Sequence, residues 1–330
     1  MKIITVLLFL TIANLCYASS WQEELLRPKY ESTYAESVAS NDYFNMEKHR
    51  EEAFSSGFQT KIPSAPVLVL EPMQHACQFR IYNYIGQVLN TYSRCIEVAT
   101  DEWWIINKPY DISRHGEDLC KQVQSDEVFK NGNFSIISFS DGGMLARYLI
   151  EYCHFDQPIR NVVTMGAPLN GVSAISHQKR SSLFGSIFDW IVDRLIKYEF
   201  MDRFIIAADY WRDPRNVDGY LHYSRFLAEA NNEVNFDEDR KDAWMHINHG
   251  LFVKWEDDTT IIPKESSHWA IYDQHFEVID RHDTILFQQD LIGLQTLEKN
   301  EQTSYITLPG DHLKFNFTQI NDLILPTLRM

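Results

Sequence analysis

The sequence predicts an α/β fold with a mostly parallel central sheet and an inserted helical cap. Three observations lead to this prediction. From Pro66 onward, short apolar runs typical of buried strands alternate with stretches at helical spacing. One of these runs, FSIISFSDGG (134–143), ends at a serine with two glycines close behind. Between Gly171 and about His249 the alternation stops and the pattern is mainly helical.

The strands and helices are expected in alternation along the chain. We predict strands at 66–70 (PVLVL), 95–99 (CIEVA), 134–140 and 160–165 (RNVVTM), with helices within 76–89, 116–129 and 143–153. Right-handed crossovers between such strands give a parallel sheet that is covered on both faces. After the insertion, strands are expected at 251–255 (LFVKW) and 305–308 (YITL), and a last helix near 317–328.

The insertion, about 171–249, holds an unusually apolar stretch at 182–206 with little polar face. One interpretation is a helix pair packed on the core. The other is a cap over the carboxyl edge of the sheet, with an apolar groove for a substrate chain. We therefore expect one catalytic domain, 64–330, that carries this cap as an insertion.

The first 18 residues predict a secretory signal peptide. Lys2 precedes the apolar run IITVLLFLTIANLCYA, and small residues come before SSWQ. The run is short for a bilayer span, so an N-terminal membrane anchor is the weaker alternative. Residues 19–63 are polar and charged, and we expect them to form an arm on the main domain. No later segment is long and apolar enough to span a bilayer, so we expect no stable membrane insertion.

Composition narrows the function classes further. The chain has 330 residues, 45% of them hydrophobic, which suffices for a substantial core. Its formal net charge of -16 repels nucleic-acid phosphates, so we expect no nucleic-acid partner. The sequence does not indicate an oligomeric state.

Four cysteines remain once a signal peptide carrying Cys16 is removed: Cys77, Cys95, Cys120 and Cys153. An even number in an oxidising compartment predicts two disulfides, with three possible pairings. There is no CxxC motif, and we expect no metal and no cofactor. Sequons at Asn133 and Asn316 predict N-glycosylation, although Asn133 adjoins a buried strand.

Ser140 is the candidate nucleophile. A serine can be held at a strand end by a nucleophile elbow, G-x-S-x-G, whose small residues let strand and helix approach closely. Here the segment is Ser138-Phe139-Ser140-Asp141-Gly142, so a serine replaces the first glycine. A plain strand-to-helix turn is the alternative interpretation.

Two further residue types follow in the order that an elbow serine requires, first an acid and then a histidine. Asp257 or Asp258 comes after the strand at 251–255, and His312 after the strand at 305–308. This order predicts two-step acyl transfer, in which Ser140 attacks a carbonyl, His312 acts as general base and the carboxylate orients the imidazole.

A developing oxyanion needs two N–H donors. We expect one from the backbone of Asp141, the residue after the nucleophile. The second should come from the loop after the first strand, LEPMQHAC, where Met73 or a neighbour could supply it.

At these residues the sequence resembles the palmitoyl-protein thioesterases, α/β-hydrolases of the lysosome and secretory pathway. The resemblance spans roughly Pro66 to Met330. The family patterns GFSQGG, WHDP, SxFLAxxNxE, VKFxNDSxVxP, QxDxxGLxxL and EGDHL are matched by SFSDGG (138–143), YWRDP (210–214), SRFLAEANNE (224–233), VKWEDDTTIIP (253–263), QQDLIGLQTL (288–297) and PGDHL (309–313).

The resemblance implies roles for individual residues. It selects Asp258 over Asp257 as the orienting acid and His312 as the base, and it aligns Met73 with the family's oxyanion donor. It also implies a Cys120–Cys153 disulfide, which leaves Cys77 to pair with Cys95.

The implied activity is hydrolysis of thioesters that join long acyl chains to cysteine or to a small thiol such as coenzyme A. Fatty-acylated proteins or peptides, or acyl-CoA, would be the substrates, the cap helices would line an acyl groove, and the location would be the lysosome or the extracellular space. Three features depart from the family. Glu71-Pro72 replace a His-Gly pair, Asp141 replaces a glutamine and would bring negative charge near the oxyanion, and the N-terminal arm is longer. A lipase or esterase acting on oxygen esters, or a catalytically impaired acyl-binding protein, are the alternatives.

Overall fold

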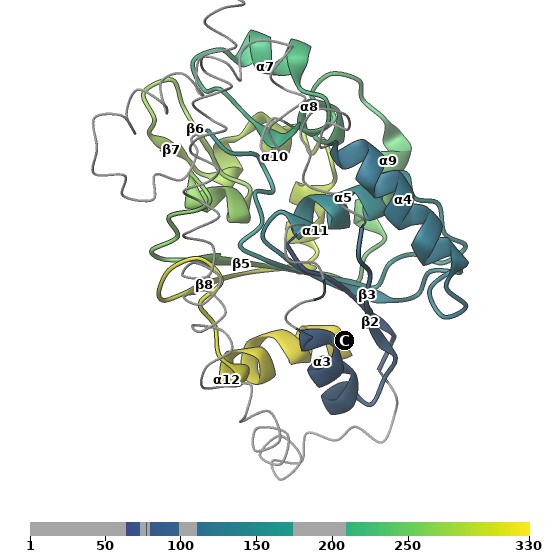
Figure 1. Cartoon of the computed structure of the whole chain (residues 1–330). Coiled ribbons are helices and arrows are strands. Elements are labelled where there is room, and N and C mark those ends of the chain that lie inside the picture. The colour runs from purple at the N-terminus through teal and green to yellow at the C-terminus, as the bar shows by residue number, and fades with distance from the viewer. Residues whose placement is uncertain (1–63, 73–76, 78–79, 99–110, 174–208) are drawn as a thin grey trace, which may run out of the picture. The chain divides into compact units, whose positions relative to one another are not determined.

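The structure is a computed structural model of the chain, and it describes residues 64–72, 77, 80–98, 111–173 and 209–330 (Figure 1). All described residues belong to the unit Ala53–Met330. The predicted signal peptide and the predicted arm lie outside the described residues. They therefore stay predictions.

Six parallel strands form the central sheet, in the order β2-β1-β3-β4-β5-β8. Their bounds are Val67–Leu70 (β1), Ser93–Cys95 (β2), Ser135–Phe139 (β3), Asn161–Met165 (β4), His249–Trp255 (β5) and Thr303–Leu308 (β8). This arrangement is an α/β-hydrolase fold, and it confirms the predicted fold class. Two further strands, β6 (Ile271–Tyr272) and β7 (Val278–Ile279), form a separate antiparallel pair that the sequence analysis missed.

The second strand lies earlier than predicted. It was expected at 95–99, but in the structure Ser93, Arg94 and Cys95 pair with Val67, Leu68 and Val69 of β1. The short partner explains the shift, because β1 ends at Leu70 and is followed by Glu71 and Pro72. Proline has no N–H to donate, so the ladder cannot continue along that strand.

Helices connect the strands and cover both faces of the sheet. α3 (Ile81–Leu89), α4 (Ile112–Ser125) and α5 (Gly142–Tyr152) link the first four strands. α7 (Val217–Tyr223), α8 (Leu227–Ala230) and α9 (Glu238–Met245) lie between β4 and β5, where the cap was predicted. α10 (Ile285–Gln288) and α11 (Leu294–Lys299) precede β8, and α12 (Phe317–Gln319), a π-helical turn (Ile320–Ile324) and α13 (Leu325–Arg329) follow it. Figure 1 shows α3 and α12 on one face of the sheet and α4, α5 and α9 on the other.

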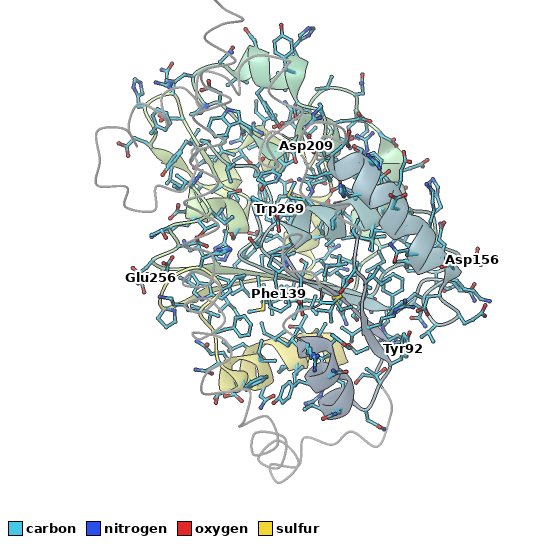
Figure 2. All side chains as sticks on the ribbon, in the orientation of Figure 1. Tyr92, Phe139, Asp156, Asp209, Glu256 and Trp269 are labelled. Atoms are coloured by element: carbon cyan, nitrogen blue, oxygen red, sulfur yellow. A yellow bond between two sulfur atoms is a disulfide. The ribbon has the colours of Figure 1, made fainter. Side chains whose placement is uncertain are left out.

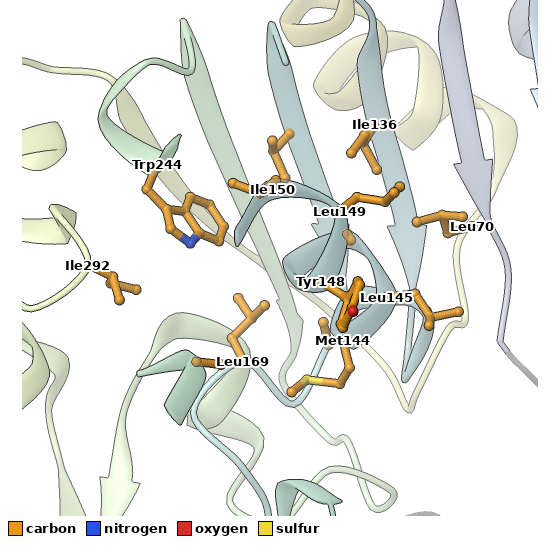
Figure 3. Close-up of a cluster of buried hydrophobic side chains, with 14 of the residues drawn as sticks. Leu70, Ile136, Met144, Leu145, Tyr148, Leu149, Ile150, Leu169, Trp244 and Ile292 are labelled. Atoms are coloured by element: carbon orange, nitrogen blue, oxygen red, sulfur yellow. The ribbon is translucent and has the colours of Figure 1, made fainter. Parts of the chain in front are cut away.

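Helix α5 lies at the centre of the core. All its residues from Gly142 to Glu151 are buried. Figure 3 shows Leu145 and Leu149 of this helix near Leu70 and Ile136 of the sheet. Burying a leucine side chain fully stabilises by about 1.5–3 kcal/mol, so the helix that starts beside Ser140 is firmly anchored.

A buried polar cluster joins α5 to the inserted helices. The Arg147 guanidinium is inaccessible to solvent and lies 2.8 Å from Glu151 Oε1. It also donates to the Leu169 carbonyl at 2.7 Å and to the Asn231 side-chain oxygen at 2.8 Å. Trp244 of α9 donates its indole N–H to Glu151 at 2.8 Å. Buried charges persist when they are paired in this way, so the cluster fixes α8 and α9 to α5.

Two of the sequence patterns shared with the thioesterases meet in an ion pair. Arg212, from YWRDP, donates to both carboxylate oxygens of Glu233, from SRFLAEANNE, at 2.8 and 2.9 Å. Tyr220 donates its hydroxyl to the same carboxylate at 2.6 Å. A bidentate arginine–carboxylate pair adds geometric specificity. These patterns therefore serve to hold the insertion together.

The apolar stretch 182–206 lies outside the described residues, so the choice between a packed helix pair and an acyl groove stays open. Within the described part of the chain, no helix combines the length and apolar character needed to cross a membrane.

Two disulfides join the cysteines in the pairing that the resemblance implied. Cys120 of α4 is bonded to Cys153, the residue after α5, and Cys77 is bonded to Cys95 at the end of β2. The first bond ties together the helices on either side of β3, and the second ties the loop after β1 to the neighbouring strand.

Candidate active site

Ser140 lies on a sharp turn between β3 and α5. Its backbone is left-handed, with φ of 51°, a conformation that costs an L-residue about 1–2 kcal/mol. The turn is held on both sides, because the Ser140 N–H donates to the Met165 carbonyl at 2.9 Å and its carbonyl accepts from Gly143 at 3.0 Å. Figure 2 labels Phe139, the residue just before this serine, on the sheet. This is the strand–turn–helix context that a nucleophile elbow requires.

The two glycines after the serine allow α5 to start against the sheet. A Cβ on Gly142 would lie 2.7 Å from the Leu70 carbonyl oxygen, and one on Gly143 would lie 2.3 Å from Ala167 Cβ. The serine in place of the elbow's first glycine is also accommodated. Ser138 is buried, and its hydroxyl donates to the Val163 carbonyl at 3.3 Å.

His312 contacts both of its predicted partners. Its Nε2 lies 2.9 Å from Ser140 Oγ, and its Nδ1 lies 2.7 Å from Asp258 Oδ2. With Asp258 as a carboxylate, Nδ1 carries the ring proton and Nε2 is free to accept the proton of the serine. The arrangement can therefore move a proton from serine to imidazole while a fixed negative charge faces the far side of the ring.

Asp258 is buried and has hydrogen bonds on both oxygens. While Oδ2 faces the imidazole, Oδ1 accepts the backbone N–H groups of Thr260 at 2.8 Å and Ile261 at 2.9 Å. Asp257 is exposed instead. Of the two acids that the sequence left open, the structure brings Asp258 to the histidine.

Of the two predicted oxyanion donors, Asp141 lies within the described residues and Met73 does not. Asp141 lies at the cap position of α5 and is half-buried. Tyr210 of the inserted segment lies within range of the Asp141 charge. Burial raises the pKa of the Tyr210 phenol well above its usual value, and the negative charges of Asp141 and Asp209 raise it further. Met73 lies outside the described residues.

Gly166 is a site residue that the sequence analysis missed. It follows β4 with φ of 63°, and a Cβ there would lie 3.0 Å from His312 Cε1 and 3.0 Å from Trp255 Cζ3. The imidazole therefore rests against a position where only glycine leaves it room. A glycine directly after the strand RNVVTM, at the carboxyl edge of the sheet, is the signal that could have identified it.

The other histidines in contact with the sheet serve the fold. His268 Nε2 lies 3.1 Å from the carbonyls of Phe252 in β5 and Ile306 in β8, and burial lowers its pKa to about 4. His249 is buried and bonds to Ser304 at 2.9 Å. Across the described ranges, no group of three histidine, cysteine, aspartate or glutamate side chains could hold a metal ion.

Both sequon asparagines are exposed. Asn316 caps α12 by accepting the Gln319 N–H through Oδ1 at 2.9 Å, whereas a glycan attaches at Nδ2. Asn133 is exposed although it adjoins Phe134, which is buried just before β3. Glycosylation at these positions stays a prediction.

Comparison with known proteins identifies a family. The model of the palmitoyl protein thioesterase family matches residues 66–312. Palmitoyl-protein thioesterase 1 of Caenorhabditis elegans is 28% identical over 208 residues, covering 62% of this chain and 69% of that protein. Lysosomal thioesterase PPT2-B of Xenopus laevis is 28% identical over 218 residues, with 61% and 74% covered. Palmitoyl-protein thioesterase 3 of Dictyostelium discoideum is 29% identical over 205 residues, with 59% and 66% covered.

The family match includes the serine turn, the acid loop and the histidine at its last position, and it covers well over half of the chain. The chain therefore belongs to the palmitoyl protein thioesterase family.

Proposed function

We propose that this protein hydrolyses long-chain fatty acyl thioesters, with Ser140 as nucleophile, His312 as general base and Asp258 as the orienting acid. The observation that carries the proposal is the continuous hydrogen-bonded line from Ser140 Oγ to His312 at 2.9 Å and on to Asp258 at 2.7 Å. Membership of a thioesterase family favours the thioester as the bond that is cleaved.

In the first half of the reaction, Ser140 Oγ attacks the thioester carbonyl carbon while its proton passes to His312 Nε2. The carbonyl π electrons move to oxygen, where the Asp141 N–H and a second donor near Met73 would stabilise the charge. The buried Asp258 carboxylate stabilises the imidazolium. The tetrahedral centre then collapses, the C–S bond breaks, and the leaving thiolate takes the proton from His312. The acyl chain is left as an ester on Ser140.

In the second half, water replaces the thiol. His312 removes a proton from water as it attacks the acyl-serine carbonyl, and returns that proton to Ser140 Oγ when the C–O bond breaks. A free fatty acid leaves and the serine is regenerated. His312 Nε2 accepts or donates the proton in every step, so both halves of the reaction depend on its contact with Ser140 Oγ.

The proposed substrates are fatty-acylated proteins or peptides, or acyl-CoA, in the secretory pathway, the lysosome or outside the cell. Relatives named lysosomal thioesterases, two disulfides and the predicted leader at 1–18 support this location. The proposed organisation adds an arm at 19–63 and a catalytic domain at 64–330, with the cap at about 171–249.

The test is to react the purified protein with a fluorophosphonate and to compare palmitoyl-CoA with p-nitrophenyl palmitate as substrates. We expect labelling and faster thioester cleavage, both lost in Ser140→Ala. Ser138→Ala is the matched control, since it removes a buried hydroxyl two residues away and should leave labelling intact. Preference for the oxygen ester would make the protein an esterase. Palmitate binding without labelling would make it an acyl-binding protein.

A further inference from the structure

Two loops carry the base and its orienting acid. The acid loop (256–261) follows β5 and includes Asp258, and the histidine loop (309–315) follows β8 and includes His312. Backbone hydrogen bonds tie the starts of the two loops: the Glu256 N–H donates to the Leu308 carbonyl at 2.8 Å, and the Asp257 N–H donates to the Gly310 carbonyl at 3.0 Å.

A further link between the two loops lies next to the imidazole and is made by the side chain of Asp311. Asp311 Oδ1 accepts the backbone N–H of His312 at 2.8 Å and the backbone N–H of Thr259 at 3.0 Å. The Thr259 hydroxyl donates to the same carboxylate, at 3.1 Å from Oδ1 and 3.3 Å from Oδ2. The carboxylate thus bonds the residue after Asp258 and the backbone of His312 at once.

The charge of this carboxylate persists in acid. Burial by itself would raise the pKa of Asp311, but the hydrogen bonds from the backbone of His312 and Thr259 and from the Thr259 hydroxyl outweigh it, with help from the Lys314 charge. The pKa of Asp311 is lowered as a result. An ionised carboxylate accepts on both oxygens, so the link between the loops holds where ordinary aspartates become protonated.

We propose that Asp311 is a positioning residue, which fixes the His312 backbone against the acid loop so that the imidazole meets Ser140 and Asp258 together. This proposal rests on the proposed function, because it assigns His312 the role of base. The imidazole must keep contacts of 2.9 and 2.7 Å to groups on two different elements. A misplacement of about 1 Å can cost roughly a hundredfold in rate, so a fixed separation of the loops has a direct effect on turnover.

The experiment compares three substitutions of Asp311 with one matched control. Asp311→Asn keeps the size and an oxygen acceptor. Asp311→Glu keeps the charge but moves the acceptor by one methylene, and Asp311→Ala removes the link. Asp290→Ala is the control, since Asp290 also accepts two backbone N–H groups and a threonine hydroxyl, from Gln295 and Thr296, while its ion pair with Lys241 at 3.2 Å connects it to α9 and not to the two loops. For each variant, kcat and KM with palmitoyl-CoA, the rate of fluorophosphonate labelling and the thermal midpoint are measured.

We expect Asp311→Ala to lower kcat and the labelling rate by about tenfold to a hundredfold, with KM within about twofold. Asp311→Asn should recover most of this loss and Asp311→Glu less. Asp290→Ala should lower the thermal midpoint while kcat per folded molecule stays at the wild-type value. If Asp311→Ala does not fold, the contrast between Asn and Glu carries the test.

Wild-type kcat in Asp311→Ala or in Asp311→Glu would overturn the inference. So would a loss of kcat in Asp290→Ala equal to that in Asp311→Ala, because stability alone would then explain both. Failure of the proposed function looks different: wild-type protein would cleave no thioester, or Ser140→Ala would cleave it normally.

Discussion

Replacing Gly166 with alanine should slow the enzyme by pressing on the imidazole. The new Cβ would lie 3.0 Å from His312 Cε1, whereas carbon atoms rest about 3.5–4.0 Å apart, so the ring must retreat by about 0.5 Å. If a shift of about 1 Å costs a hundredfold, half of it costs about tenfold in kcat, or about 1.4 kcal/mol of transition-state stabilisation. Left-handed backbone adds about 1–2 kcal/mol of lost stability.

Gly293→Ala separates these two effects. Gly293 also has positive φ, 78°, but its Cβ would press on the Met245 side chain, 2.5 Å from Cγ, and not on a residue of the site. It should lose stability without losing kcat. The assay is palmitoyl-CoA hydrolysis with a thiol-trapping dye, alongside guanidinium unfolding. Equal kcat in Gly166→Ala and wild type, or an equal loss in both glycine variants, would refute the steric reasoning.

Three further predictions concern stability. Replacing Cys120 and Cys153 with serine opens a loop whose ends are 33 residues apart, and should lower the unfolding free energy by about 3–4 kcal/mol in a denaturant titration. Asp209 is buried, and burial raises its pKa to about 7 against the pull of a nearby arginine. The protonated Asp209 is therefore favoured in the folded state. The unfolding free energy that this contributes is fully present below the unfolded pKa of about 4, and is lost as pH rises through about 7. Asp209→Asn should flatten the decline in unfolding free energy across that window, and an unchanged slope would contradict the assignment. Arg212→Met leaves Glu233 buried without its guanidinium and should cost about 3–5 kcal/mol, and the double variant Arg212→Met/Glu233→Leu should recover much of that loss.

β1, β3 and β4 could be predicted because each is a mostly apolar run, whereas β2 consists of Ser93, Arg94 and Cys95 and was placed too late in the sequence. β3 and β4 are buried on both faces, and their predicted bounds differ from those in the structure by at most one residue at each end. The hairpin of β6 and β7 was missed because each strand has two residues and is only partly buried, so neither makes an apolar run. A two-residue strand is too short to show the alternation of apolar and polar residues by which a strand is predicted.

Some residues of the site could likewise be predicted from the sequence, and others needed the fold. Ser140 and His312 could be identified because their residue types and their order along the chain carry chemical meaning. The choice of Asp258 over Asp257 needed either the resemblance or the fold, since the two are neighbours in sequence and only burial separates them. The only sequence signal for Gly166 is a glycine at the end of a strand, and its role needs the fold, because it leaves space for a ring that lies 146 positions further along the chain.

The position of β8 in the sheet has a consequence for when activity begins. This strand lies at the edge beside β5, and His312 comes just after it, 172 residues beyond Ser140. During synthesis the serine turn leaves the ribosome long before the imidazole does. On the proposed mechanism, a nascent chain that has folded through β5 carries an inert hydroxyl. On the same mechanism, acylated proteins in its compartment are not hydrolysed until the final strand pairs, and a chain that lacks residues 303–330 has no activity.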